Sequence, residues 1–320
     1  MQRLVCLGEI LIDFLPIETA GEVTGFSMHP GGGPFNVAVG LARLGRPTAF
    51  VSKVGADFFG RRLRRAVQRE GIDDRWLLTA PIAPTTLAFV AHEGGEPVFT
   101  FYGDDAADTL LTPAELPDEL FAETSMLHFG GISLLRGDTP EAALTAAERL
   151  RGRALVSLDP NIRPKLISDE VVYRATLERA VAACDILKVS AADVAWLAPG
   201  SDIEAYALAQ LECGPAVALL TRGGEGALAL RKTPDGIERV AVAGFAVKVI
   251  DTVGAGDSFT AGVLAALSQY GVVDRQTLLD LSPAKLREVL RYGAATAAIN
   301  CTRPGADPPR ADEVAALLAQ

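Results

Sequence analysis

The sequence predicts an α/β fold, in which helices flank a mostly parallel sheet and a small second sheet forms a lid. From residue 126 onward, short apolar runs alternate with helical patterns, which is typical of βαβ units and a parallel sheet. Earlier in the chain, two strand-like runs flank Glu93-Gly94-Gly95-Glu96 and predict a hairpin that interrupts this alternation. Neither an internal repeat nor a linker divides the 320 residues, so we expect a single domain over residues 1–320.

The individual elements follow from apolar periodicity. Short apolar runs predict buried strands at residues 4–8, 49–54, 126–129, 154–158, 186–189 and 216–221, and an antiparallel pair at 226–230 and 237–241. Periodic patterns predict helices at residues 37–44, 58–70, 140–151, 171–183, 264–270, 283–299 and 311–318. Asp57 directly precedes the second of these helices and is suited to cap its N-terminus.

The lid is expected to comprise approximately residues 14–30 and 85–102. Such a small sheet beside the main one could close over a reactive group and exclude water from it. A plain surface hairpin is an equally good interpretation of the second segment when it is taken alone.

Composition narrows the functional classes. Hydrophobic residues make up 49% of the chain and no low-complexity tract occurs, so the chain is expected to be ordered. The net charge of −10 argues against a nucleic-acid binder that depends on a basic face, although backbone amides could still bind a nucleotide. The four cysteines lie far apart, and no apolar run reaches the ~18 residues of a membrane span. Together with a strand pattern at the start of the chain, these features predict a cytoplasmic protein.

A glycine-rich stretch in the C-terminal part of the chain carries the strongest chemical signal. After an acid, Asp251, two glycines (Gly254 and Gly256) precede a second acid, Asp257, and an apolar helical pattern follows. This is typical of a tight turn that opens a helix, where free backbone N–H groups and the helix dipole attract an anion such as phosphate. Asp257 is then either a general base beside a phosphoryl group or a plain helix cap, and the stretch alone favours neither.

Polar residues also follow several predicted strands. The C-terminal ends of four strand patterns carry them: Asp13, the segment 159–163, Lys188 and the segment 221–224. Parallel sheets bind ligands at the edge formed by these strand ends. A second glycine turn, at residues 31–33, opens another helix pattern. These positions predict one ligand-binding edge rather than several scattered sites.

The residues at this edge favour phosphoryl transfer. The chain has no Gly-Lys dipeptide and therefore no Walker P-loop. In the remaining scheme, the turn before Asp257 holds phosphoryl oxygens and Asp257 takes the proton of an acceptor hydroxyl. Arg163 and Lys188 are candidates for stabilising charge, because positioning and electrostatics supply most of the catalysis in such reactions.

Three stretches resemble the ribokinase-like carbohydrate kinases of the pfkB family. Residues 251–257 resemble the family signature, residues 30–38 resemble its N-terminal glycine-pair motif, and residues 54–60 resemble the segment after its second strand. The resemblance covers nearly the whole chain. It implies a Rossmann-like core with a small β lid, ATP as donor, Mg²⁺ as cofactor and a sugar alcohol as acceptor.

By position, the resemblance implies that Asp257 is the catalytic base and that Gly254, Ala255 and Gly256 form an anion hole. It implies a sugar-binding set made of Asp13, Gly32, Gly33 and Asn36, with Arg163 near the substrate or its phosphate. The implied nucleotide contacts are Lys188, Ser190, Asp193, Thr221, Gly223 and Gly226, with Asn300 near the adenine.

The resemblance also implies metal ions. Many relatives organise Mg²⁺ through an Asn-x-x-Glu stretch, and the matching stretch here is Ser190-Ala191-Ala192-Asp193. Asp193 keeps the charge while the Asn is absent. Asp251, with the carbonyl of Val253, matches a monovalent-cation site for which K⁺ is the expected ion.

Within the family, two stretches resemble fructokinases: residues 101–108, although Gly103 replaces the Arg usual there, and residues 300–309. The expected reaction is phosphorylation of fructose at its 6-hydroxyl by ATP. Ribose, 2-keto-3-deoxygluconate, another ketose or a nucleoside stay open as acceptors, as does a non-catalytic sugar or nucleotide sensor on the same fold. Because the lid often carries a dimer contact in this family, a homodimer through residues 85–102 is also expected.

Overall fold

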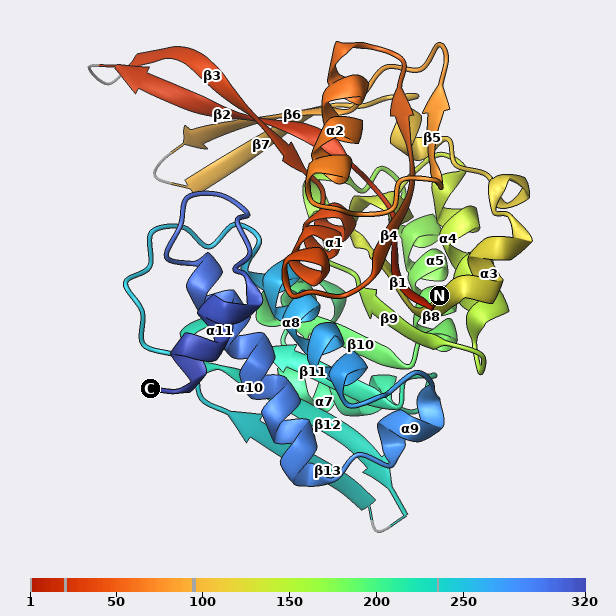
Figure 1. The fold of residues 1–320 in the computed structure, drawn as a ribbon, viewed down its shortest axis with the longest axis vertical. Coiled ribbons are helices and arrows are strands. Elements are labelled where there is room, and N and C mark those ends of the chain that lie inside the picture. Colours follow the sequence, from red (N-terminus) through yellow and green to blue (C-terminus); the bar gives the residue numbers. More distant parts are fainter. Residues whose placement is uncertain (1, 20–21, 94–95, 235) are drawn as a thin grey trace.

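A nine-stranded sheet forms the centre of the protein (Figure 1). The computed structural model describes residues 2–19, 22–93, 96–234 and 236–320, and in these residues the strand order is β13-β12-β11-β10-β9-β8-β1-β4-β5. The parallel strands are β1 (Arg3–Leu7), β4 (Thr48–Gly55), β5 (Leu77–Ala80), β8 (Thr124–Gly130), β9 (Leu155–Asp159), β10 (Ile186–Ser190) and β11 (Val217–Thr221). At one edge, β12 (Ala227–Thr233) and β13 (Gly236–Val242) are antiparallel. The predicted α/β class, the mostly parallel sheet and the antiparallel edge pair are confirmed.

Helices cover both faces of this sheet. The α-helices are α1 (Gly33–Arg43), α2 (Phe58–Arg69), α3 (Asp118–Glu123), α4 (Thr139–Leu150), α5 (Glu170–Ala183), α6 (Ala191–Leu197), α7 (Ile203–Gln210), α8 (Ala255–Gln269), α9 (Arg275–Leu279), α10 (Pro283–Asn300) and α11 (Ala311–Leu318). Short 3₁₀ turns are η1 (Ala107–Thr109), η2 (Pro113–Glu115), η3 (Gly131–Leu134), η4 (Pro164–Leu166) and η5 (Gly223–Glu225).

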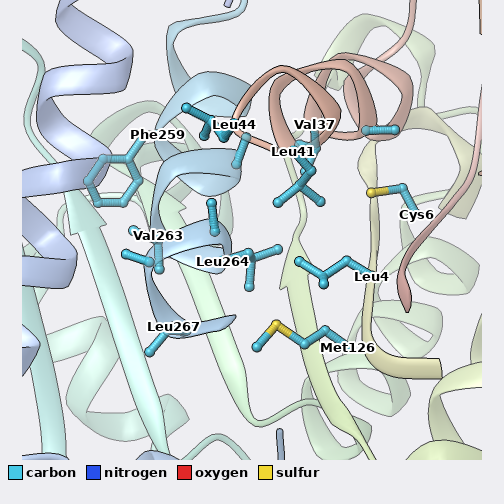
Figure 2. Close-up of a cluster of buried hydrophobic side chains, with 14 of the residues drawn as sticks. Leu4, Cys6, Val37, Leu41, Leu44, Met126, Phe259, Val263, Leu264 and Leu267 are labelled. Carbon is cyan, nitrogen blue, oxygen red and sulfur yellow. The ribbon is translucent and has the colours of Figure 1, made fainter. Parts of the chain in front are cut away.

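Two hydrophobic cores lie on opposite faces of the sheet, because successive side chains of a strand point to opposite sides. Leu4 and Cys6 of β1 join a core built with α1, α2, α8 and α10, whereas Val5 and Leu7 join one built with α4, α5 and α7. Figure 2 shows the first core, where Leu41 of α1 lies near side chains of α8. This packing places the N-termini of α1 and α8 at the same edge of the sheet.

The lid is a separate sheet of four strands in the order β3-β2-β6-β7, and it projects from the body of the molecule in Figure 1. It comprises β2 (Leu11–Thr19), β3 (Glu22–Gly31), β6 (Leu87–Glu93) and β7 (Glu96–Tyr102). Phe14 and Phe89 stack with ring centroids 4.5 Å apart and join the two hairpins. The prediction that these two segments form one small sheet is confirmed, while Gly94 and Gly95 at the expected hairpin tip lie outside the described residues.

Some elements differ from the predictions. The helical pattern predicted after the glycine turn and the helix predicted at residues 264–270 form one continuous helix, α8, from Ala255 to Gln269. Helix α1 begins at Gly33, within the glycine turn that was predicted to open it, and therefore extends the pattern at residues 37–44 by four residues. Pro34 fits its first turn, where the missing N–H is not needed. Strand β5 and helices α3, α6, α7 and α9 were not predicted. Each is eight residues or shorter, which is too short to show a clear apolar period.

The cap predicted at Asp57 is confirmed, since its Oδ1 accepts a hydrogen bond from the backbone N–H of Gly60 in the first turn of α2. Of the helices in the described residues, none combines the length and the apolar character needed to span a membrane.

Candidate active site

The glycine turn at residues 254–256 lies at the N-terminus of α8, as predicted. Gly254 has a left-handed backbone conformation (φ 72°), and α8 begins at the next residue. A Cβ atom at Gly254 would lie 2.6 Å from Cβ of Ala306, and one at Gly256 would lie 3.0 Å from Nζ of Lys188. The first turn of α8 has no side-chain cap. The N–H of Ala255 donates to the carbonyl of Thr252 at 3.2 Å, and the N–H groups that follow it in the first turn remain available to an anion.

Asp257 lies in this first turn, but it does not cap the helix. Its Oδ2 instead accepts a hydrogen bond of 2.9 Å from Nδ2 of Asn36. The residue is only 8% exposed, and this burial raises the pKa of its carboxyl, while Asn36 and the charges of Lys188 and Arg163 oppose the rise. The helix-cap interpretation is wrong, and a carboxylate with a raised pKa fits the alternative role of a general base.

Asn161 contacts the other oxygen of this carboxylate, and the sequence had placed it in the segment 159–163 at the ligand-binding edge without giving it a role of its own. Its Nδ2 lies 3.4 Å from Oδ1 of Asp257, and its Oδ1 accepts a hydrogen bond of 2.7 Å from Nη1 of Arg163. Its backbone is left-handed (φ 42°), which Asn tolerates better than most residues. The available signal was its place after Asp159-Pro160 at the end of β9. Asn36 and Asn161 therefore donate from opposite sides to one carboxylate.

Asp13, on lid strand β2, lines a cavity of about 470 Å³ together with Asn36, Phe35 and Val253. Burial raises the pKa of Asp13 to about 7, opposed by the charge of Arg163 and reinforced by Asp257. The Asp13 carboxylate lies directly against Gly31, where a Cβ atom would be 2.0 Å from its Oδ2. The described structure thus brings Asp13 and Asn36 to one cavity beside Asp257.

The glycines predicted to bind sugar lie next to this carboxylate. Gly32 precedes α1 with a φ of 114°, and Gly33 is the first residue of the helix. A Cβ atom at Gly33 would be 3.2 Å from Nδ2 of Asn161 and 3.6 Å from Oδ1 of Asp257. A side chain at this position would crowd the carboxylate and its neighbour.

Lys188, on β10, forms a buried ion pair with Asp159, with 2.9 Å between Nζ and Oδ2. Burial raises the pKa of Asp159 to about 6, although Lys188 opposes the rise. Burial favours the neutral form of Lys188, but the neighbouring carboxylates of Asp159, Asp193 and Asp257 outweigh it and raise the pKa of Lys188. The ammonium group therefore stays charged directly beside the glycine turn.

A second cavity, of about 250 Å³, lies on the other side of the turn. It is lined by Thr221, Gly223, Gly226, Ala255 and Gly256, among others. Its apolar wall includes Phe245, Ala294 and Ala298, which could receive a flat apolar ring such as a nucleotide base. Three of the predicted nucleotide-binding residues therefore meet in one cavity.

Three other residues predicted to bind the nucleotide form hydrogen bonds within the protein. Ser190 caps α6, and Asp193 accepts hydrogen bonds from Ser190 and from the backbone N–H of Ile162. Asn300 is fully buried, and its amide bonds the carbonyl of Val253 and the N–H of Asp307. Its neighbours Ala297, Ala298 and Cys301 line the second cavity, so a place for Asn300 near the adenine stays a prediction.

The predicted cation site lies in a loop that is tied to the C-terminal segment. Oδ1 of Asp251 accepts from the N–H of Val253 at 3.0 Å, and its Oδ2 accepts from the N–H of Gly305 at 2.8 Å. Both oxygens are thus used within the protein, although each retains a free lone pair. Asp251 and Val253 line the first cavity, on the side away from Thr221.

Taken together, these contacts place the glycine turn and Asp257 between two cavities. One contains carboxylate and amide groups suited to hydroxyls, and the other contains glycines, a threonine and apolar walls. Three groups lie between the two cavities. They are the carboxylate of Asp257, whose pKa is raised, the uncapped N-terminus of α8 and the buried ammonium of Lys188. Such a site can activate a hydroxyl and stabilise a phosphoryl group.

Comparison with known proteins identifies the family. Residues 1–313 match the sequence profile described as pfkB family carbohydrate kinase. The chain belongs to the pfkB family. It is 37% identical over 287 residues to a fructokinase from Rhizobium leguminosarum bv. trifolii, an alignment that covers 89% of this chain and 85% of that protein.

Solved structures of pfkB-type kinases have the same fold. The fructokinase of Xylella fastidiosa with bound ATP is 31% identical, with a TM-score of 0.89 and coverage of 99% of this chain and 98% of that one. A double-mutant fructokinase from Vibrio cholerae O395, with fructose, ADP and a potassium ion bound, is 30% identical, with a TM-score of 0.82 and coverage of 100% and 98%. The predicted family, the ribokinase-like fold class and the assignment as a carbohydrate kinase are confirmed.

The ion pair of Lys188 and Asp159 provides a test of the site's electrostatics. Lys188→Met leaves the buried carboxylate of Asp159 without its cation, so we expect the free energy of unfolding to fall by about 3–5 kcal/mol. The double variant Lys188→Met, Asp159→Asn removes both charges and should recover most of that loss. Urea denaturation measures both values. A double variant as unstable as Lys188→Met would show that the loss does not come from the unpaired charge of Asp159.

Proposed function

We propose that this carbohydrate kinase transfers the γ-phosphoryl group of ATP to the 6-hydroxyl of fructose. The proposal rests chiefly on the two cavities that flank the glycine turn, one containing Asp13 and Asn36 and the other Thr221 and Gly226. Fructose is supported by the 37% identity to the Rhizobium fructokinase. The likeness to fructokinases bound to ATP or to fructose supports both substrates.

In the proposed mechanism, Asp257 accepts the proton of the sugar hydroxyl while that oxygen attacks the γ-phosphorus atom. A new O–P bond forms, and the bond from phosphorus to the bridging oxygen breaks, so that ADP leaves. The backbone N–H groups of Gly254, Ala255 and Gly256 stabilise the charge on the transferred group, and Lys188 adds a positive charge nearby.

Substrate binding is proposed to divide between the two cavities. Asp13, Asn36 and the N–H groups of Gly32 and Gly33 hold sugar hydroxyls, and Arg163 faces the substrate or its phosphate. On the other side, Thr221, Gly223 and Gly226 hold the nucleotide. Ser190 and Asp193 support the nucleotide site without contacting the nucleotide, because their polar atoms already form hydrogen bonds within the protein.

Metal ions are proposed to accompany the nucleotide. In the described residues no group of three His, Cys, Asp or Glu side chains could hold a metal ion, so Mg²⁺ would be carried mainly by the ATP phosphates and water. Bound in this way, Mg²⁺ would neutralise negative charge on the phosphates. The loop containing Asp251 and the Val253 carbonyl suits a weakly held K⁺, because oxygen groups gather there at the rim of the first cavity.

We further infer that residues 1–320 act as one kinase domain and that the enzyme works in the cytoplasm. The four cysteines are free thiols, which suits a reducing compartment. A homodimer through the lid is supported by its exposed apolar side chains, among them Ile17, Val23 and Tyr102, which are 48%, 55% and 63% exposed.

The lid dimer is tested by Val23→Glu. A charge on this face should shift the protein from dimer to monomer, because desolvating an unpaired carboxylate in an apolar contact is costly. Sedimentation velocity measures the mass of both proteins. Val171→Glu, at an exposed apolar position on α5, serves as the control. A wild-type monomer at all concentrations, or a dimeric Val23→Glu, would refute the proposal.

The proposed reaction is tested with Asp257→Asn. An amide cannot accept the hydroxyl proton, so turnover should fall by about two to four orders of magnitude. Coupled ADP-release assays with fructose, ribose, 2-keto-3-deoxygluconate and adenosine identify the acceptor, and fructose should give the highest kcat/KM. Sugar binding by calorimetry should persist in the variant. Near-normal turnover of Asp257→Asn would refute the mechanism, and turnover with none of the four acceptors would favour a sensor.

The pH dependence tests the environment of Asp257. The base must be ionised, and burial raises its pKa, so activity should be lost on the acid side at a higher pH than an ordinary Asp would give. Arg163→Met removes a charge that lowers the pKa of both Asp257 and Asp13, and should move this acid limb of kcat/KM to still higher pH. Lys165→Met, which removes an exposed charge from the same segment, should leave the limb unchanged. If the acid limb of kcat/KM stayed at its wild-type pH in Arg163→Met, the assignment of Asp257 as the base would be contradicted.

A further inference from the structure

Glu9 is a buried acid that the reaction described above does not use. It lies between β1 and β2 and is 3% exposed. Its Oε1 accepts a hydrogen bond of 3.0 Å from the backbone N–H of Gly33, and its Oε2 accepts one of 3.1 Å from the N–H of Ser133 in η3. Within the described residues it forms no ion pair. Burial raises the pKa of its carboxyl to about 7, and the N–H donors of Gly33 and Ser133 oppose the rise by favouring the carboxylate. A buried acid without a cation in such a place calls for a specific role.

The position of Glu9 is where the lid joins the core. Two of the connections between the lid and the core pass here, the segment from β1 to β2, which contains Glu9, and the short step from β3 to α1 at Gly32 (Figure 1). The two segments touch, since a Cβ atom at Gly32 would lie 2.5 Å from the carbonyl oxygen of Glu9. The Glu9 carboxylate thus links the start of α1 to the segment between β1 and β2 and to η3.

This tie leads directly to the reacting groups. Gly33, which donates to Glu9, is followed within one helical turn by Asn36, whose amide donates to Asp257. Gly33 also lies against Asn161 and Asp257. A shift of the Gly33 backbone would therefore move both a predicted sugar-binding turn and a hydrogen-bond donor to the base.

We propose that Glu9 is a positioning residue, whose carboxylate holds the turn at residues 31–33 so that the sugar and Asn36 are presented to Asp257. The inference rests on the proposed sugar kinase reaction. Two backbone N–H donors need two acceptor oxygens, and a carboxylate supplies both. A glutamine of the same length supplies one acceptor and one donor, so it can satisfy only one of the two N–H groups.

The substitution Glu9→Gln separates this role from a general structural one. We expect the KM for sugar to rise by about 5- to 50-fold, which corresponds to leaving one buried donor unsatisfied. The KM for ATP should not change, because the nucleotide cavity lies on the other side of the glycine turn. In amide hydrogen exchange, the N–H of Gly33 or of Ser133 should exchange faster than in the wild type.

Asp185→Asn is the matched control. Asp185 is also buried, at 1% exposure, and its Oδ2 also accepts a backbone hydrogen bond, from Val156 at 3.0 Å, while its Oδ1, unlike Glu9, pairs with Arg275 at 3.3 Å. It precedes β10 and so lies at the end of the sheet away from the site. This variant should lose stability without a change in the KM for sugar.

The outcomes separate the inference from the proposed function. An unchanged sugar KM in Glu9→Gln, or equal rises in both KM values, would overturn the role of Glu9. So would a rise in sugar KM of the same size in Asp185→Asn. Wild-type protein that turns over no sugar would overturn the proposed function instead. In that case amide exchange still decides whether Glu9 holds Gly33, with unchanged exchange refuting it.

Discussion

The hydrogen bond from Asn36 to Asp257 joins two parts of the chain that are 221 residues apart, and the arrangement of the site depends on it. It requires the N-termini of α1 and α8 to lie side by side. The two helices can approach closely because Gly40 of α1 faces Ala261 of α8, where a Cβ atom at Gly40 would be only 2.6 Å from the alanine methyl group. A pair of small residues in the core thereby sets the distance at which an amide meets the carboxylate above it.

The second constraint is electrostatic. A protein with a net charge of −10 must receive a highly negative nucleotide beside several carboxylates. It concentrates positive potential locally, with the buried ammonium of Lys188 next to Gly256 and the guanidinium of Arg163 near Asp257. Uncapped N–H groups of α8 add partial positive charge without a mobile side chain. Preorganised groups of this kind need not rearrange during the reaction, which is why they stabilise developing charge efficiently.

Sequence reasoning succeeded where local chemistry determines the structure. The glycine turn with Asp257, the cap at Asp57 and the lid hairpins follow from residue types at short spacing. It failed where tertiary contacts decide. The internal hydrogen bonds of Asn300, to the carbonyl of Val253 and the N–H of Asp307, could not be foreseen from the sequence. Glu9 was missed because its partners, Gly33 and Ser133, are 24 and 124 residues away, which leaves no local pattern to read. Asn161 was placed at the ligand-binding edge, but its contact with Asp257, 96 residues away, was not foreseen.

The strand order of the lid leaves β3 and β7 as edge strands. Unpaired backbone groups along such edges invite another strand to add to the sheet. Each of these strands contains a proline, Pro30 in β3 and Pro97 in β7, and proline has no N–H to donate. The row of donors is therefore interrupted on both sides. A strand added along either edge would therefore lose a hydrogen bond at the proline, which disfavours extension of this sheet by a second copy of the chain.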